Sequence, residues 1–128
     1  MRIISTSLAP AAIGPYSQAI FVWDFLYLSG QIGLDPDSMT LVQDTLEDEV
    51  ERIIANIRAV LQEAKLELDH VIKTTIFLTE IADFQSVNEV YGKYFSHKPA
   101  RSTVAVKALP KGARVEIECV AYSADLFI

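Results

Sequence analysis

Residues 99–118 read PARSTVAVKALPKGARVEIE, and the placement of charges in this stretch decides how the chain is interpreted. Two alternating apolar runs flank the segment 109–112, where proline fixes φ and glycine allows positive φ. The pattern predicts two strands joined in a hairpin. Arg101 opens the first strand, and Glu116 and Glu118 lie inside the second. A planar cation and a carboxylate at strand level are the groups needed to hold a small carboxylic acid and activate a water molecule.

Length and composition predict one soluble domain over residues 1–128. A chain of 128 residues is long enough for one hydrophobic core and short for two. Apolar residues make up 51% of it, but no run is long enough to span a membrane and the N-terminus lacks a signal-peptide pattern. We therefore expect a cytoplasmic protein with no membrane partner.

Charge and cysteine content restrict the classes of function. The net charge of −6 argues against a nucleic-acid partner, because surfaces that bind nucleic acid are usually basic and gain affinity by neutralising phosphates. The single cysteine, Cys119, excludes an internal disulfide and a multi-cysteine metal site. We expect it to be a buried thiol in a strand, and we expect no metal and no cofactor.

Hydrophobic periodicity predicts the element order β, ββ, α, β, α, ββ. Apolar residues recur at helical spacing between Leu46 and Ala64, after an acidic first turn that Asp44 or Thr45 can cap. Residues 71–78 are mostly β-branched or aromatic and predict a central strand. The order favours an α+β domain with two helices on one face of a mixed sheet. The other expected elements are strands over residues 2–5, 16–22 and 25–29, and a helix that Asp83 can cap.

The first hairpin and the second helix each contain polar side chains that are candidates for a functional site. With a two-residue turn, Gln18 faces Ser29, and Tyr16 and Gln31 join Ser29 at the open end of the hairpin. Asn88 falls in the apolar stripe of the second helix, where a buried amide needs hydrogen-bond partners. It is either a core amide satisfied by nearby backbone or a ligand contact.

The predicted terminal hairpin keeps Arg101 and Glu116 apart. In its register Glu116 faces Val106 and Arg101 faces Ala121, which separates the two charges by roughly 16 Å along the ladder. A three- or four-carbon acid cannot bridge that distance. We therefore predict that a site using both residues takes them from different subunits, or from strands not paired in this register.

Six blocks of the sequence carry a resemblance to a known family, and PARS is the most specific of them. They are AAIGPYSQA at 11–19, SGQ at 29–31, VIKTTIF at 71–77, VN at 87–88, PARS at 99–102 and LPKGARVEIE at 109–118. Over nearly the whole chain the blocks resemble the RidA/YjgF family of enamine/imine deaminases. The resemblance implies a homotrimer of chorismate-mutase-like subunits with sites at the subunit interfaces. It also implies a cofactor-independent hydrolase that converts reactive 2-imino acids, such as that from 2-aminoacrylate, to 2-keto acids and ammonia.

The resemblance also implies roles for single residues. Arg101 would bind the substrate carboxylate, the main chain at Thr103 would contact substrate, and Glu116 would position the water. Many members carry a cysteine where this chain has Thr103, so a reactive thiol is lost while the backbone groups remain. The residues that would complete the pocket are Tyr16, Ser29 and Asn88.

Alternative interpretations stay open at this stage. Arg101 could be a strand-end residue paired with a neighbouring carboxylate, and one of Glu116 and Glu118 could simply face solvent. The family has also been described as an endoribonuclease that inhibits translation, against which the acidic balance argues. A third class is a regulatory trimer that binds small carboxylates through Arg101 without turning them over.

Overall fold

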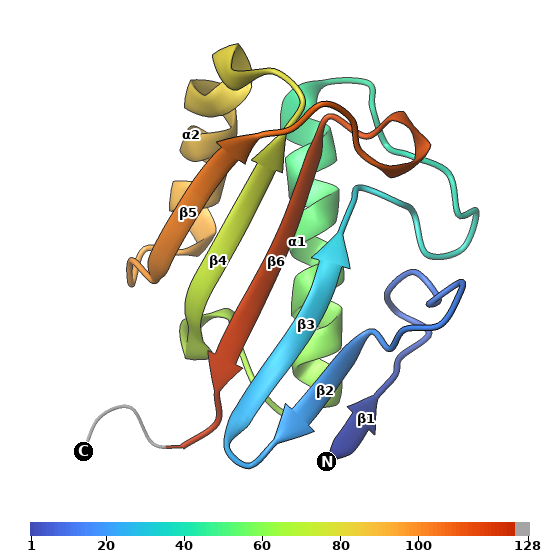
Figure 1. Ribbon diagram of the computed structural model, residues 1–128, viewed down its shortest axis with the longest axis vertical. Coiled ribbons are helices and arrows are strands. Elements are labelled where there is room, and N and C mark those ends of the chain that lie inside the picture. The colour runs from blue at the N-terminus through green and yellow to red at the C-terminus, as the bar shows by residue number, and fades with distance from the viewer. Residues whose placement is uncertain (125–128) are drawn as a thin grey trace.

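The computed structural model describes residues 1–124 as one mixed six-stranded sheet with two helices packed on one face (Figure 1). The strand order is β1-β2-β3-β6-β4-β5. The predicted α+β architecture and element order are confirmed. The strands are β1 (Arg2–Ile4), β2 (Ala19–Val22), β3 (Phe25–Gln31), β4 (Val71–Leu78), β5 (Ala100–Ala105) and β6 (Val115–Tyr122), and the helices are α1 (Leu46–Glu63) and α2 (Phe84–Tyr94).

The predicted terminal hairpin is wrong, because β4 lies between β5 and β6. β5 pairs with β4 in parallel and β6 pairs with it antiparallel, so Arg101 lies opposite Thr74 and Glu116 lies opposite Phe77. Helix α2 provides the long crossover that a parallel pair requires. The segment 106–114 is long enough to connect β5 to β6 past β4. Because β4 lies between these two strands, the backbone groups on both of its edges have hydrogen-bond partners.

The first hairpin agrees with its predicted register, although β2 begins later than expected. Val22 pairs with Phe25 across the two-residue turn, and the amide of Ser29 donates to the carbonyl of Gln18 at 3.0 Å. The Gln18 side chain leaves the ladder: its Nε2 donates to the Pro10 carbonyl at 2.8 Å and its Oε1 accepts from the Thr6 amide at 2.7 Å. These bonds hold the N-terminal loop against the sheet.

The core lies between the sheet and the two helices, and most of the apolar stripe of α1 is fully buried. Thr45 caps this helix, since its Oγ1 accepts from the Asp48 amide at 3.0 Å. Asp83 precedes α2 but makes no side-chain capping bond. Cys119 is buried in β6 as expected, and burial raises the pKa of its thiol to about 12. Within residues 1–124, no helix has the length and apolar character needed to cross a bilayer.

The second face of the sheet is left uncovered by both helices (Figure 1). In β6, Val115 and Ile117 are buried towards the helices, whereas Glu116 and Glu118 alternate with them and point to the uncovered face. This face also exposes large apolar side chains, an arrangement typical of an interaction surface. They include Ile3, Val22, Phe25, Tyr27 and Val104.

Candidate functional site

Arg101 lies in a pocket of about 390 Å³ between the edge strand β5 and helix α2. Its Nη1 donates to Asn88 Oδ1 at 2.6 Å, and its guanidinium carbon lies 5.4 Å and 5.0 Å from the ring centroids of Phe84 and Tyr91. These contacts orient the guanidinium through a hydrogen bond and cation–π attraction. No carboxylate among residues 1–124 forms an ion pair with it, so the strand-end ion-pair alternative is wrong for this part of the chain.

The rest of this arginine pocket is neutral or positively charged. Tyr91 is buried, and its hydroxyl forms a 2.7 Å hydrogen bond with Thr74 Oγ1. Burial raises the pKa of Tyr91, which keeps its phenol neutral. Asn88 is exposed, so the core-amide alternative is wrong, and its amide instead contacts Arg101. Lys98 also lines the pocket, which therefore suits a small carboxylate.

Thr103 lies two positions beyond Arg101 on the same strand. Its Oγ1 is buried and has no hydrogen-bond partner among the described residues. β5 is the last strand of the sheet, so in residues 1–124 no strand pairs with its outer edge. Backbone groups on that edge are therefore available to a ligand or to another chain.

Glu116 lies in a second cavity, of about 650 Å³, on the uncovered side of the sheet. The predicted cluster of Tyr16, Ser29 and Gln31 lines this glutamate cavity, as does Glu118. The cavity therefore joins polar groups to an apolar wall drawn from the N-terminal and 32–39 loops. The apolar lining is made by Pro10, Ala11, Ile13, Ile32, Leu34 and Met39.

A β-bulge shapes the cavity beside Glu116. Leu28 pairs with Cys119 and Gln31 with Ile117, so two residues, Ser29 and Gly30, lie opposite one residue of β6. Gly30 is needed there because a Cβ at this position would lie 2.4 Å from Glu116 Oε2. The carboxylate therefore rests directly over the backbone of the bulge.

The Glu116 carboxyl is half-buried, and its pKa is raised. Burial raises its pKa above the usual value of a glutamate, and the neighbouring charge of Glu118 adds to the rise. Ser29 Oγ donates to the Ser17 carbonyl at 2.6 Å, which leaves its oxygen free to accept a hydrogen bond. Tyr16 is 53% exposed at the mouth of the cavity.

Arg101 and Glu116 do not meet within one chain. Arg101 contacts α2 on the covered face, whereas Glu116 points to the uncovered face. Their strand positions differ by two strand spacings and three residues along β4, about 10 Å in each direction. The predicted register was wrong, and the two strands are indeed not paired with each other, which is one of the two alternatives that the prediction left open. The separation of the two side chains follows from their opposite faces and not from the hairpin register.

The comparisons with known proteins identify the family of the chain. A family model described as Endoribonuclease L-PSP matches residues 6–123. The human 2-iminobutanoate/2-iminopropanoate deaminase is 48% identical over 126 residues, which cover 98% of this chain and 92% of that protein. The chain belongs to the RidA/YjgF family.

Solved structures from this family share the fold. RidA from the Antarctic bacterium Psychrobacter sp. PAMC 21119 is 42% identical with a TM-score of 0.91, and the match covers 95% of this chain and 99% of that one. TdcF from E. coli, solved with bound serine, is 35% identical with a TM-score of 0.92, and the match covers 97% and 100%.

Several features of the site were missed from the sequence. The Ser29-Gly30 pair within an apolar strand was a signal for a bulge, and the glycine was a signal for close backbone approach. The apolar wall of the glutamate cavity comes from loops, whose residues carry no periodicity. The ion pair between Glu49 and Arg114 had no local signal, because its partners are far apart in the sequence.

Proposed function

We propose that the protein is a cofactor-independent deaminase that hydrolyses 2-imino acids to 2-keto acids and ammonia. Each site would form in a homotrimer, from the arginine pocket of one subunit and the glutamate cavity of its neighbour. The observation that carries the proposal is that one sheet bears a guanidinium with no ion-pair partner among residues 1–124 on one face and a half-buried carboxyl of raised pKa on the other. Two faces of the same sheet can join in one site only across an interface.

The arginine pocket supplies the part that binds the substrate carboxylate. The Arg101 fork matches a carboxylate in plane, and Asn88 holds it in place through one N–H, leaving other N–H groups for the ligand. The bound serine described for the E. coli relative supports this proposal, because serine also carries a carboxylate next to a nitrogen-bearing carbon. Backbone groups of Thr103 would complete the binding of substrate.

The glutamate cavity supplies the groups for hydrolysis. Glu116 takes a proton from water as the oxygen attacks the C=N carbon, which yields a tetrahedral carbinolamine. Its carboxylic acid then returns the proton to the nitrogen. In the second step Glu116 takes the proton of the carbinolamine hydroxyl and passes it to the nitrogen as the C–N bond breaks, which releases a 2-keto acid and ammonia. A raised pKa brings Glu116 closer to the operating pH and so favours both directions of transfer. Tyr16 and Ser29 would hydrogen-bond the departing nitrogen.

The uncovered sheet face supplies the surface for assembly. Its exposed apolar side chains, among them Tyr27 and Phe25, lose contact with water when another copy covers them. Glu116 lies on the same face as they do, so an interface there would enclose the glutamate cavity. An enclosed cavity excludes bulk water and strengthens the electrostatic contacts within it.

RNA cleavage is the activity that the description of the family model names. The charge of the glutamate cavity disfavours it here, because Glu116 and Glu118 both line the cavity and repel phosphate. We therefore assign RNA no role in the proposed function.

The test is to generate 2-imino acids with an amino-acid oxidase and to measure ammonia and 2-keto acid release with and without the protein. We expect accelerated release with the wild type, no acceleration with Arg101→Ala, and bound but poorly hydrolysed substrate with Glu116→Gln. Binding of 2-keto acids without accelerated release would support the sensing trimer and refute the enzyme. Native mass spectrometry of the same sample should give three chains per particle.

A further inference from the structure

An ion pair between a buried glutamate and a partly exposed arginine joins helix α1 to the start of β6, the strand that carries Glu116. Glu49 is 0% exposed, in the first turn of the helix. Its Oε1 accepts from Arg114 Nε at 2.7 Å and its Oε2 accepts from the Arg114 backbone amide at 2.8 Å. One carboxylate therefore fixes both the side chain and the main chain of the residue that precedes β6.

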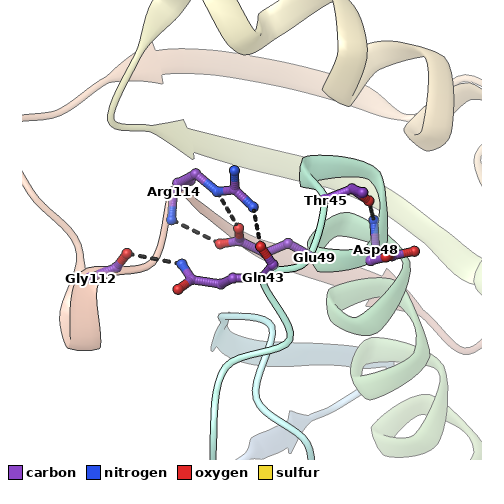
Figure 2. A network of polar contacts seen from close by, with 6 residues as sticks. All are labelled: Gln43, Thr45, Asp48, Glu49, Gly112 and Arg114. Carbon is purple, nitrogen blue, oxygen red and sulfur yellow. Dashed lines mark hydrogen bonds and ion pairs between the residues drawn. The ribbon is translucent and has the colours of Figure 1, made fainter.

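The network continues into the turn before β6 (Figure 2). Arg114 Nη2 donates to the Gln43 carbonyl at 3.3 Å, and Gln43 Nε2 donates to the Gly112 carbonyl at 3.1 Å. These hydrogen bonds join three segments to one another: the start of α1, the loop before it and the Pro110–Gly112 turn. A shift of any one segment would therefore break a hydrogen bond to another.

The turn in this network forms part of the wall of the glutamate cavity. Pro110 and Lys111 line the cavity from the turn. The loop that carries Leu34 and Met39 is held by the same helix, since Asn56 Nδ2 of α1 donates to the Leu34 carbonyl at 2.9 Å. Glu116 itself follows Arg114 by two residues.

A fully buried carboxylate is a costly way to gain stability. Glu49 is removed from water while its partner Arg114 keeps 37% of its side chain exposed, and this loss of hydration opposes the attraction between them, so well-packed apolar residues often stabilise a fold as well or better. A carboxylate that binds a backbone amide and a guanidinium together does what apolar packing cannot, because it fixes the direction of both groups. The arrangement therefore favours a role in geometry.

We propose that Glu49 and Arg114 are positioning residues, which hold the entrance of β6 so that Glu116 meets the substrate in the reactive geometry. The inference rests on the proposed hydrolase function. Neither side chain lines the glutamate cavity, so both act through the turn and through the strand. Misplacement of a catalytic group by about 1 Å can cost roughly 100-fold in rate, so small shifts at the entrance of β6 matter.

The first test variant is Glu49→Gln, which keeps the size of the side chain and an acceptor for the Arg114 amide but removes the charge. We expect kcat to fall by about 10- to 100-fold while KM changes by less than about threefold, because the change affects a group that acts in the transition state. The matched control is Glu47→Gln, an exposed acid in the same helical turn, which should match the wild type.

The second test is the pair of variants Arg114→Met and Glu49→Gln/Arg114→Met. The double variant should be about as slow as either single variant, because the two residues act as one unit. If Arg114→Met alone fails to fold, the comparison of Glu49→Gln with the double variant still tests whether the two residues act as one unit. Circular dichroism at the assay temperature selects the folded proteins for comparison.

Wild-type kcat in folded Glu49→Gln, with only a lower melting temperature, would overturn the inference and leave the pair as a stabilising contact. Absence of turnover by the wild type would instead refute the proposed function. The inference then depends on amide hydrogen exchange: residues 110–116 should exchange faster in Glu49→Gln than in Glu47→Gln, and equal exchange would overturn it.

Discussion

Replacing Gly30 with alanine should disable the site with little effect on the fold. The new Cβ would lie 2.4 Å from Glu116 Oε2 and 2.8 Å from its Cδ, whereas ordinary contacts begin near 3.4 Å. The collision is with the end of a flexible side chain, so the Glu116 carboxylate should move by about 1 Å while the backbone stays. Gly30 has no positive φ, so alanine adds no backbone strain.

A displacement of this size should lower kcat/KM about 100-fold. Stability should fall by only about 0.5–1.5 kcal/mol, the cost of pushing one side chain away from its preferred rotamer. Imine hydrolysis measures the first effect and urea unfolding measures the second. In a Glu116→Ala background the same substitution should cost no stability, because the colliding group is gone. Wild-type turnover by Gly30→Ala, or an equal stability loss in both backgrounds, would refute the reasoning.

Two further predictions concern the charged groups. Arg101→Lys should raise KM for 2-imino acids at least about tenfold, because a lysine cannot bind a carboxylate in bidentate fashion. The melting temperature of this variant should stay at the wild-type value. An unchanged KM in steady-state assays would contradict the role of Arg101 in binding the substrate carboxylate. Glu116 must be ionised to accept a proton, and its raised pKa makes that form disappear at a higher pH than for an exposed glutamate, so turnover should fall early on acidification. Glu118→Gln removes the like charge and should shift this acid limb of the pH–rate profile to lower pH, whereas an unmoved limb would exclude coupling between the two carboxyls.

Local patterns in the sequence predicted most of the fold. The stripe from Leu46 and the β-branched run at residues 71–78 each bury a face that their own periodicity defines, so both elements were placed nearly to the residue. The two-residue turn after Val22 fixed the register of the first hairpin.

The order of the last three strands could not be predicted in this way. Residues 99–118 have the pattern of a hairpin, but pairing between β5 and β4 depends on where α2 returns the chain. Nothing within that stretch reports the position of another strand. The predicted hairpin therefore placed Arg101 opposite Ala121, whereas the structure places it opposite Thr74, where α2 holds the guanidinium.

Residue types indicated part of the candidate site, and three-dimensional contacts supplied the rest. Tyr16 and Ser29 were placed near each other from register alone, and they line one cavity with Glu116. The bulge at Gly30 and the Glu49–Arg114 pair depend on approach between distant segments, which sequence spacing does not encode.

The composite site is tested most directly by mixing two inactive variants, Arg101→Ala and Glu116→Gln, under conditions that exchange subunits. A site made from Arg101 of one chain and Glu116 of its neighbour is intact wherever a Glu116→Gln chain supplies the arginine and an Arg101→Ala chain supplies the glutamate. Random trimers from an equal mixture should therefore recover about one quarter of wild-type turnover. If native mass spectrometry shows mixed trimers and turnover stays at the level of the separate variants, the site is not shared between chains.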